Sequence, residues 1–247
     1  MSNFTTWRSL VDGEEIAGIP DSAVHHYSVT DFTTSNWPDS EGNNDLNVNG
    51  LSADSTAFGG EGGVQGDGSD DYGESSPPNI NPTEPWAVAF SFNTTGTGLT
   101  GFLDNDNNSG LMIGTGDPSN LTAGRMNLWL GHTGLSDTGD ALQIGTSSSV
   151  DDGSDYKLIL QNTGSNPSAN DIEFYLDDPD SQASTNTAND NTIDGTVFNV
   201  SDFGHYARWR EDSNTFEEYW SVVKSDIFWF NDSLNQSERN GVMDILP

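Results

Sequence analysis

The sequence predicts an all-β protein, a two-sheet antiparallel jelly-roll sandwich with a short C-terminal helix. Short segments of alternating apolar and polar residues recur along the chain, and clusters of Gly, Asn, Asp and Ser separate them. This pattern is typical of sandwiches and barrels. The alternation gives each segment one apolar and one polar face, which favours antiparallel sheets over a parallel sheet that is buried on both faces.

Four central segments show this alternation clearly and predict strands. Their inward sets are Trp86, Val88, Phe90 and Phe92 in residues 85–93; Met126, Leu128 and Leu130 in 124–131; Tyr156, Leu158 and Leu160 in 155–162; and Ile172, Phe174 and Leu176 in 171–178. The last segment leaves Asp171, Glu173, Tyr175 and Asp177 on its outward face. Because side chains alternate between the faces of a strand, the inward sets define the expected core.

The other parts of the chain complete a single domain over residues 20–247, preceded by an N-terminal arm over 1–19. Residues 50–76 and 179–195 are rich in small and polar residues, which predicts long loops. Residues 216–224 and 225–232 predict two further strands. The closing segment predicts a helix that Asp232 or Ser233 caps, with apolar residues on one side at Leu234, Val242, Ile245 and Leu246.

The composition is strongly acidic, with 39 Asp+Glu against 7 Lys+Arg and a formal net charge of −32. Nucleic-acid affinity depends on Lys and Arg replacing counterions, so this balance excludes a nucleic-acid partner. The absence of cysteine excludes a disulfide scaffold, a zinc–thiolate site and a cysteine nucleophile. No phosphate-binding glycine loop of the G-x-x-x-x-G-K type occurs either.

The acidity comes from 28 Asp and 11 Glu combined with only two Lys. At about 1 M salt the Debye length falls to roughly 3 Å, and repulsion within such a surface largely disappears. The composition therefore predicts a halophilic protein. Intrinsic disorder is the alternative, but seven Trp, twelve Phe and six Tyr favour a folded chain.

Targeting signals are the next feature. No segment approaches the ~20 apolar residues of a membrane helix, so no membrane span is expected. Residues 1–22 lack the basic flank and apolar run of a secretory signal. If Met1 is the natural start, export by the usual route is not expected.

Six segments, in order, resemble the concanavalin A-like lectin/glucanase superfamily, and specifically its laminin-G-like branch. They are residues 19–32, 37–50, 63–76, 85–92, 172–178 and 227–246. The sequence departs from the family pattern where Glu41 interrupts a Ser–Gly turn, where Gly66 replaces a Phe and where Asp178 replaces a Gly. The resemblance implies a two-sheet jelly roll. It brings no single function, since members include carbohydrate-binding modules, adhesion domains, glucanases and virion proteins.

Catalytic chemistry has little support in the sequence, and no catalytic residue is predicted. The resemblance would imply a Glu-x-Asp-x-(x)-Glu strand in a glucanase, and the chain has none. The outward set of Asp171, Glu173 and Asp177 beside Tyr175 is an acid–base alternative, although neighbouring carboxylates are expected on any surface of so acidic a chain. His25 and His26 lie within the first strand and are interpreted as structural, and His132 and His205 form no metal or catalytic spacing.

Calcium is the candidate cation, because hard cations prefer clustered carboxylates and carbonyls. Asp104, Asp106 and Asn108 have the 1, 3, 5 spacing of a calcium loop, without its Gly at position six or its terminal Glu. A plain hairpin turn is the competing interpretation. Asp70 and Asp71 are a weaker alternative.

Carbohydrate binding would use exposed aromatic rings, but the sequence does not identify a ligand site. The candidate rings are Trp129, Trp209, Trp220, Trp229, Tyr175 and Tyr219. Alternation cannot separate the exposed rings from core rings.

The combined interpretation is a non-enzymatic structural surface protein of a haloarchaeal virus particle, such as a spike, turret or capsid-decorating subunit. Such a protein is made in the host cytoplasm and needs no export signal. Residues 1–19 would contact other virion proteins, the protein would form a homo-oligomer, and its domain would face outward toward host glycans. The alternative is a halophilic carbohydrate-binding or adhesion module on a cell surface or outside the cell. A glycosidase with an unrecognised site is the third possibility.

Overall fold

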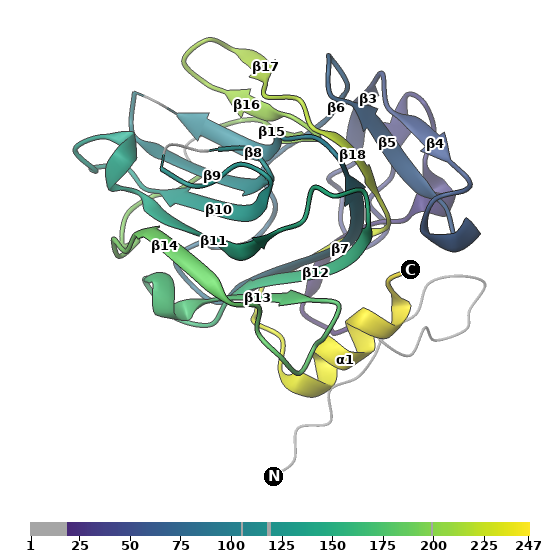
Figure 1. Cartoon of the computed structure of the whole chain (residues 1–247). Coiled ribbons are helices and arrows are strands. Elements are labelled where there is room, and N and C mark those ends of the chain that lie inside the picture. The colour runs from purple at the N-terminus through teal and green to yellow at the C-terminus, as the bar shows by residue number, and fades with distance from the viewer. Residues whose placement is uncertain (1–18, 105, 118–119, 199) are drawn as a thin grey trace.

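The computed structural model describes residues 19–104, 106–117, 120–198 and 200–247. Within them the chain forms two β-sheets packed face to face, which confirms the predicted all-β sandwich (Figure 1). The one α-helix among the described residues, α1 (Gln236–Ile245), follows the last strand, also as predicted. The arm expected at residues 1–19 lies outside the described residues, apart from Ile19.

The first sheet has eight strands in the order β1-β19-β7-β18-β5-β4, and β12 pairs with both β7 and β13. Its strands are β1 (Ala23–Tyr27), β4 (Ser52–Asp54), β5 (Gly63–Asp67), β7 (Trp86–Thr94), β12 (Asp155–Asn162), β13 (Ile172–Leu176), β18 (Ser221–Lys224) and β19 (Ile227–Phe230). All of its pairs are antiparallel.

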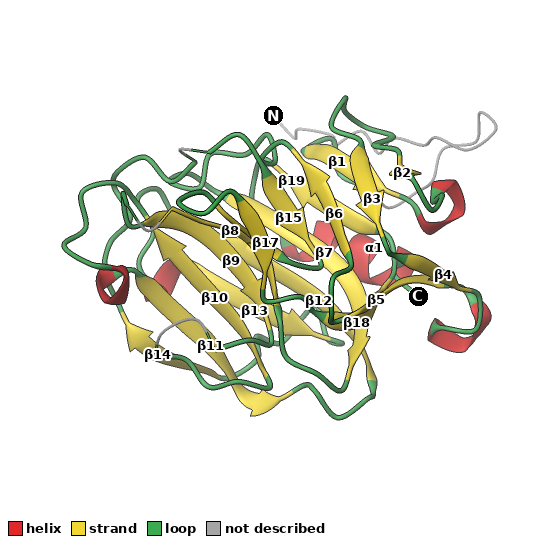
Figure 2. Cartoon of the chain, turned by 90° about the horizontal axis from the view of Figure 1, so that it is seen from above, coloured by secondary structure: helices red, strands yellow, loops and turns green. Residues whose placement is uncertain are grey.

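The second sheet has eleven strands, and its main path runs β14-β11-β10-β9-β8-β15-β6-β3-β2. Its strands are β2 (Asn36–Trp37), β3 (Leu46–Asn49), β6 (Tyr72–Ser75), β8 (Leu99–Asp104), β9 (Ser109–Gly114), β10 (Arg125–Gly131), β11 (Leu142–Ser149), β14 (Thr185–Asn189), β15 (Phe203–His205), β16 (Arg208–Arg210) and β17 (Thr215–Glu217). The β16–β17 hairpin joins β8 through a parallel pair, whereas the other pairs are antiparallel. Figure 2 shows β8 to β11 side by side across this sheet.

The main core lies between the two sheets. The predicted inward residues of residues 85–93 and 124–131 are buried there, together with Leu158, Leu160, Ile172 and Phe174. Tyr156 and Leu176 are only partly buried at its margin. The alternation in these segments therefore identified the inward faces correctly.

A second apolar layer lies on the opposite face of the eight-stranded sheet, beneath α1. Ala87, Ile159 and Tyr175 are buried there against Val242 and Met243 of the helix. The expectation of a polar outward face is wrong for β7, β12 and β13, because the helix covers that face. Tyr175 is only 4% exposed, and the Arg239 guanidinium carbon lies 4.2 Å from its ring centroid.

The helix begins later than predicted. Asn235 is the N-cap, and its side chain accepts hydrogen bonds from the backbone N–H groups of Ser237 and Glu238. Glu238 in return accepts from the Asn235 N–H at 2.8 Å, which completes a capping box. Asp232 instead accepts from the adjacent Ser233 N–H outside the helix. The predicted cap at Asp232 or Ser233 is therefore wrong by two or three residues.

Three loop and strand predictions are also corrected. The 50–76 segment contains β4, β5 and β6, and the 179–195 segment contains β14. These polar, glycine-rich segments join the sheets through backbone hydrogen bonds. Such bonds do not depend on residue type, so the composition of the segments did not predict the strands. The single strand predicted over 216–224 is divided into β17 and β18 by Glu218, whose φ is +53°.

Among the described residues, no helix has the length and apolar character needed to cross a membrane.

Candidate functional site

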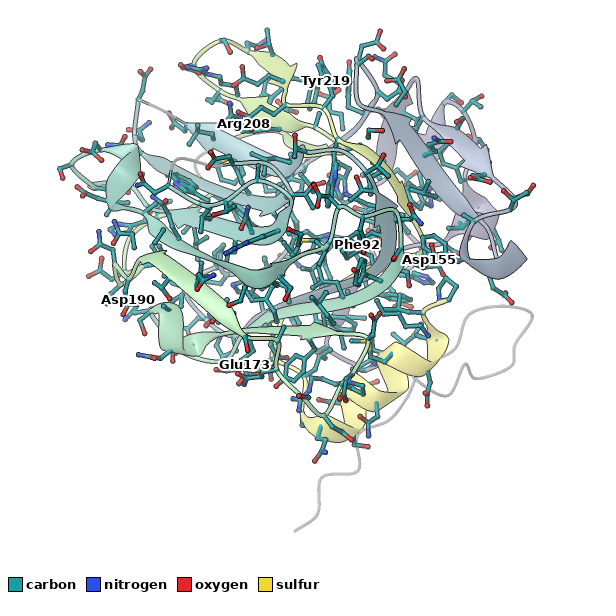
Figure 3. The ribbon with its side chains drawn as sticks, viewed as in Figure 1. Phe92, Asp155, Glu173, Asp190, Arg208 and Tyr219 are labelled. Atoms are coloured by element: carbon teal, nitrogen blue, oxygen red, sulfur yellow. The ribbon has the colours of Figure 1, made fainter. Side chains whose placement is uncertain are left out.

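The aromatic candidates separate by burial. Trp129, Trp209, Trp220, Trp229 and Tyr175 are between 0% and 6% exposed, so they are core residues. Tyr219 is partly exposed, and it lies beside two rings that the sequence did not single out, Tyr72 and Phe216. We call Tyr72, Phe216 and Tyr219 the aromatic ledge. Figure 3 shows Tyr219 at the edge of the sandwich, next to the β16–β17 hairpin.

The ledge is a packed unit joining two elements that are distant in sequence. The rings of Tyr72 on β6 and Phe216 on β17 stack with centroids 3.9 Å apart and planes 21° from parallel. The Tyr219 hydroxyl donates to the Phe216 carbonyl at 3.0 Å. Trp209 supports Phe216 from the core side, with ring centroids 4.9 Å apart. These partly exposed rings are therefore held in place before any ligand arrives.

Ion pairs hold the hairpin that carries Phe216. The Arg208 guanidinium contacts Glu217 and lies 3.0 Å from Glu218. Arg210 pairs with Asp212 at 2.6 Å and with Glu217 at 3.3 Å. Burial raises the pKa of Glu218, and the nearby charge of Arg208 partly offsets that rise. A network of charges of this kind orients a hairpin better than an isolated surface pair does.

A polar groove of about 480 Å³ lies on the same sheet face as the ledge. Its lining residues are Asn43, Asn44, Asp45, Asn47, Glu74, Ser75, Ser76 and Asp202. Tyr72 and Glu74 are two residues apart on β6, so their side chains share one face of the strand. Glu74 pairs across the sheet with Gly204, over which Phe216 packs. The aromatic rings therefore flank the groove.

Asp39 organises the loop that forms one wall of the groove. Its carboxylate accepts from His25 Nδ1 at 2.6 Å, and from the backbone N–H groups of His26, Glu41 and Asn44 at 3.1–3.2 Å. Burial alone would raise the pKa of Asp39, but the hydrogen bonds from His25 and His26 outweigh it and leave the pKa lowered. Asp39 is thus ionised and structural.

The two histidines of β1 are fastened to the same region. His25 Nε2 accepts from the Asn79 N–H at 2.8 Å, so the proton of the neutral ring lies on Nδ1, facing Asp39. His26 contacts Asp226 at 3.0 Å and stacks on Phe228. Both rings are buried, which agrees with their interpretation as structural residues.

The amide of Asn44 connects this loop to the end of β6. Its Nδ2 donates to the Ser76 carbonyl at 2.9 Å, and its Oδ1 accepts from the Ser76 N–H at 3.0 Å. The remaining groove residues supply carboxylates, amides and hydroxyls. Such groups accept from and donate to ligand hydroxyls. Burial, together with the charge and hydrogen bonding of adjacent Asp202, raises the pKa of Glu74.

An acidic group borders the ledge. One carboxylate oxygen from each of Asp67, Asp70 and Asp71 lies within 4.8 Å of the others. Asp71 also accepts from the Asp67 N–H at 2.8 Å. Burial, followed by the charges of Tyr72 and Asp70, raises the pKa of Tyr219. Two of the three residues are the weaker cation alternative of the sequence, and the structure adds Asp67.

The predicted calcium loop forms the hairpin turn between β8 and β9. Asp104 accepts from the N–H groups of Asp106 and Asn107 at 3.1 and 3.2 Å, and from the Asn107 side chain at 2.5 Å. Asn108 has a φ of +54° and donates from its side chain to the Leu135 carbonyl. The structure therefore shows the turn, and the cation at Asp104, Asp106 and Asn108 stays a prediction.

The outward carboxylates of 171–178 have structural partners. Asp171 accepts from Ser168, Glu173 accepts from Gln161 and Tyr175, and Asp177 accepts from the Lys157 N–H. They lie at the α1 side of the molecule, far in the fold from the polar groove, as the position of Glu173 shows (Figure 3).

The sequence missed Tyr72, Glu74 and Phe216 for identifiable reasons. Tyr72 and Glu74 lie in a segment that the sequence analysis interpreted as a loop. Partly buried and buried residues alternate in this segment, as they do in a strand, and this alternation could have revealed β6. Phe216 comes to Tyr72 from 144 positions away, through pairing that no local pattern encodes.

Comparisons with known proteins support the fold. No protein-family model matches the sequence, and no curated protein sequence matches it significantly. The structure is similar to the binding domain of Botulinum neurotoxin DC in complex with SialylT, with a TM-score of 0.60 and 14% identity over 92% of this chain and 52% of that chain. It is also similar to Trypanosoma rangeli sialidase in complex with sialic acid, with a TM-score of 0.56 and 13% identity over 96% of this chain and 35% of that one.

A third similar structure is the binding domain of Paraclostridial Mosquitocidal Protein 1, with a TM-score of 0.61 and 11% identity over 90% of this chain and 52% of that chain. The chain spans about half the length of the two toxin domains and about a third of the sialidase. At these identities the likeness concerns the fold. It shows that the chain shares a β-sandwich fold with parts of these proteins.

Proposed function

We propose that this protein is a carbohydrate-binding domain whose ligand occupies the polar groove and stacks on the aromatic ledge. The observation that carries the proposal is the position of Tyr72 and Phe216 beside a groove of carboxylate and amide side chains. Sugar rings present apolar faces to aromatic rings and hydroxyls to planar polar groups, and this surface offers both. Two similar structures are named as complexes with SialylT and with sialic acid, which supports a glycan ligand.

The test is a titration with an oligosaccharide panel in molar salt, comparing wild type with Tyr72→Ala and Tyr72→Phe. Loss of the ring removes a stacking contribution of about 1 kcal/mol, so Tyr72→Ala should weaken binding about fivefold. Tyr72→Phe keeps the ring and should bind like wild type. Gln65→Ala, on an exposed position of the other sheet, is the surface control. Absence of binding to any glycan across the salt range would contradict the proposal, and binding unaffected by Tyr72→Ala would contradict this site.

We propose that binding occurs without catalysis. Asp45, Glu74 and Asp202 are the acidic residues that line the groove, and Glu74 lies close enough to Asp202 for that carboxylate to raise its pKa. A retaining pair is about 5–5.5 Å apart, and an inverting pair is farther apart still. The glycosidase alternative predicts that the protein releases reducing ends from an oligosaccharide. That activity should be lost in Glu74→Gln if the groove is the active site, and in Glu173→Gln if the outward carboxylates of β13 act instead.

The finer proposal places this domain on the surface of a haloarchaeal virus particle. The charge of −32 supports a high-salt setting, and an outward-facing lectin-like sandwich suits contact with host glycans. Residues 1–19 would contact other virion proteins, and the protein would form a homo-oligomer. The alternative setting is an adhesion module on a halophile's cell surface or outside the cell.

The virion proposal is tested by mass spectrometry across a high-salt density gradient of lysate. Sedimentation of this chain in fixed ratio to a major capsid protein is the expected result. Removal of residues 1–19 should then abolish incorporation and leave the domain folded. A chain that stays with soluble or cell-bound protein would contradict the virion setting and leave glycan binding to be judged separately.

A further inference from the structure

Among the Lys and Arg side chains that the structure describes, one has no partner. The structure describes six Lys and Arg side chains, and five of them have partners: Arg208 and Arg210 in ion pairs, Lys157, Lys224 and Arg239 in hydrogen bonds. Arg125, at the start of β10, forms neither an ion pair nor a hydrogen bond with any described residue. In a chain with 39 acidic residues an unpaired arginine is unexpected.

Asp151, the acidic residue beside Gly124, does not pair with Arg125. The carboxylate of Asp151 lies against the backbone of Gly124, where a Cβ atom would come within 2.6 Å of Asp151 Oδ2. Gly124 has a φ of +81°, which glycine adopts without strain. Asp151 thus lies beside the residue that precedes Arg125 without pairing with Arg125, and the guanidinium keeps its five donors for another group.

Arg125 lines a groove of about 240 Å³ on the outer face of the eleven-stranded sheet. Thr122, Asn186 and Thr187 are exposed on its rim, and Asn127 and Gly145 lie buried in its lining. The groove is built on β10, β11 and β14, which lie at the opposite end of the sheet from β3 and β6 (Figure 1). It is therefore separate from the polar groove and the aromatic ledge.

A second atom in this groove also has no partner. Asn127 is fully buried, and its Nδ2 donates to the carbonyls of Gly116 and Thr122 at 2.7 and 2.9 Å. Its Oδ1 accepts no hydrogen bond in the structure. Buried polar atoms are nearly always paired, so an unpaired acceptor in the lining of a groove indicates a donor that comes with a ligand.

We infer that this groove is a second binding site, which takes a sugar residue bearing an anionic group, a carboxylate or a sulfate. Arg125 would hold the anionic group through charge-assisted, bidentate hydrogen bonds. Asn127 lies two residues along β10 on the same face, about 7 Å away, and its Oδ1 would accept from a hydroxyl of the same sugar. Thr122 and Thr187 offer hydroxyls to the rest of the ring.

The surrounding charge gives this site an unusual salt response. Long-range repulsion from the acidic chain opposes an anionic ligand at low salt, and added salt screens it. The contact pair with half-buried Arg125 is screened much less. Affinity should therefore rise between about 0.05 and 0.5 M KCl, whereas an isolated arginine–anion pair would weaken.

The experiment follows ¹⁵N-labelled protein by NMR while methyl β-glucuronide, methyl β-glucoside or glucose 6-sulfate is added. We expect saturable shifts of the Arg125 Nε–H and the Thr122 and Asn186 amides with an anionic sugar and not with the neutral glucoside. Arg125→Gln should weaken that binding about tenfold or more. Lys157→Gln, which removes the same charge from the other sheet, should leave it unchanged. Comparison of methyl β-glucuronide with glucose 6-sulfate shows whether the site prefers a carboxylate or a sulfate.

Several results would overturn the inference: shifts of the same size in Arg125→Gln, equal binding of the neutral glucoside at these residues, or no shift with either anionic sugar. Tyr72→Ala separates the two sites, because it should leave the Arg125 shifts intact. Failure here with retained binding at the ledge would therefore count against the second site alone.

Discussion

Lys224 is a charged residue placed inside the sandwich core. It is 1% exposed, and its Nζ donates to Thr100 Oγ1 at 2.7 Å. The rings of Tyr206, Trp220 and Phe90 surround it with centroids 4.5–5.2 Å from Nζ. These rings favour the charged form, whereas burial opposes it and lowers the pKa of Lys224 to about 7.

This lysine should make stability depend on pH. Below pH 7 both the folded and the unfolded chain carry the proton, and the cost of burying the charge is fully present. Between pH 7 and 10.5 the unfolded chain binds more protons, so the free energy of unfolding should rise with pH by on the order of 5 kcal/mol. Lys224→Met should remove that rise and stabilise the protein at pH 7, as measured by urea unfolding. Lys157→Met is the control, and an unchanged pH slope in Lys224→Met would contradict the argument.

The calcium proposal also belongs to single residues. Carboxylate and amide oxygens are ligands that calcium prefers, and Asp104, Asp106 and Asn108 bring three such side chains to one turn. We expect millimolar calcium to raise Tm, with the rise lost in Asp106→Ala. Asp70→Ala tests the acidic group of Asp67, Asp70 and Asp71. Loss of the calcium effect in Asp70→Ala alone would move the site to that group.

Helix α1 shows how one element decides the burial of a whole sheet face. It covers Ala87, Ala89 and Ile159, so β7 and β12 are buried on both sides. Its start depends on the Asn235 cap, because the first N–H groups of a helix have no partners within the helix.

Removing the cap should therefore lower stability. Asn235→Ala should cost about 1 kcal/mol in the free energy of unfolding, as caps typically do. Asp232→Ala, at the cap position that the sequence suggested, should change it by less than about 0.5 kcal/mol. Chemical unfolding of the two variants measures the difference, and equal losses would contradict the capping assignment.

The net charge is a property of the whole molecule. At low salt the acidic surface repels itself, and the compact state suffers more than the unfolded chain. Salt in the molar range screens this repulsion.

We therefore expect Tm to rise steadily from 0.1 to 2 M KCl, by roughly 2–4 °C for each 1 kcal/mol gained. Replacing exposed Asp21, Asp31 and Glu61 with Lys changes the charge from −32 to −26 and should flatten the salt dependence. Calorimetry at each salt concentration provides the measurement. A Tm that is constant or falls with salt would contradict a halophilic surface.

Local sequence pattern is enough to predict the fold class, the inward faces of the central strands and the presence of a closing helix. These follow from local alternation and periodicity, which the residues carry wherever the chain goes. Only the tertiary structure decided which rings are exposed. Trp129 and Tyr219 both lie in segments that the sequence predicts to be strands, yet the sandwich buries the first ring and leaves the second partly exposed at its edge.

The two proposed sites were likewise decided by tertiary pairing. Tyr72 stacks on Phe216, and Arg125 lines one groove with Asn186, only because strands distant in the sequence come together in one sheet. The strands of a sheet are joined by backbone N–H and C=O groups, which are alike at every residue. The sequence pattern of a strand therefore determines which side chains face the core, but it does not determine which strands lie beside it. Binding sites on a sheet depend on those neighbours.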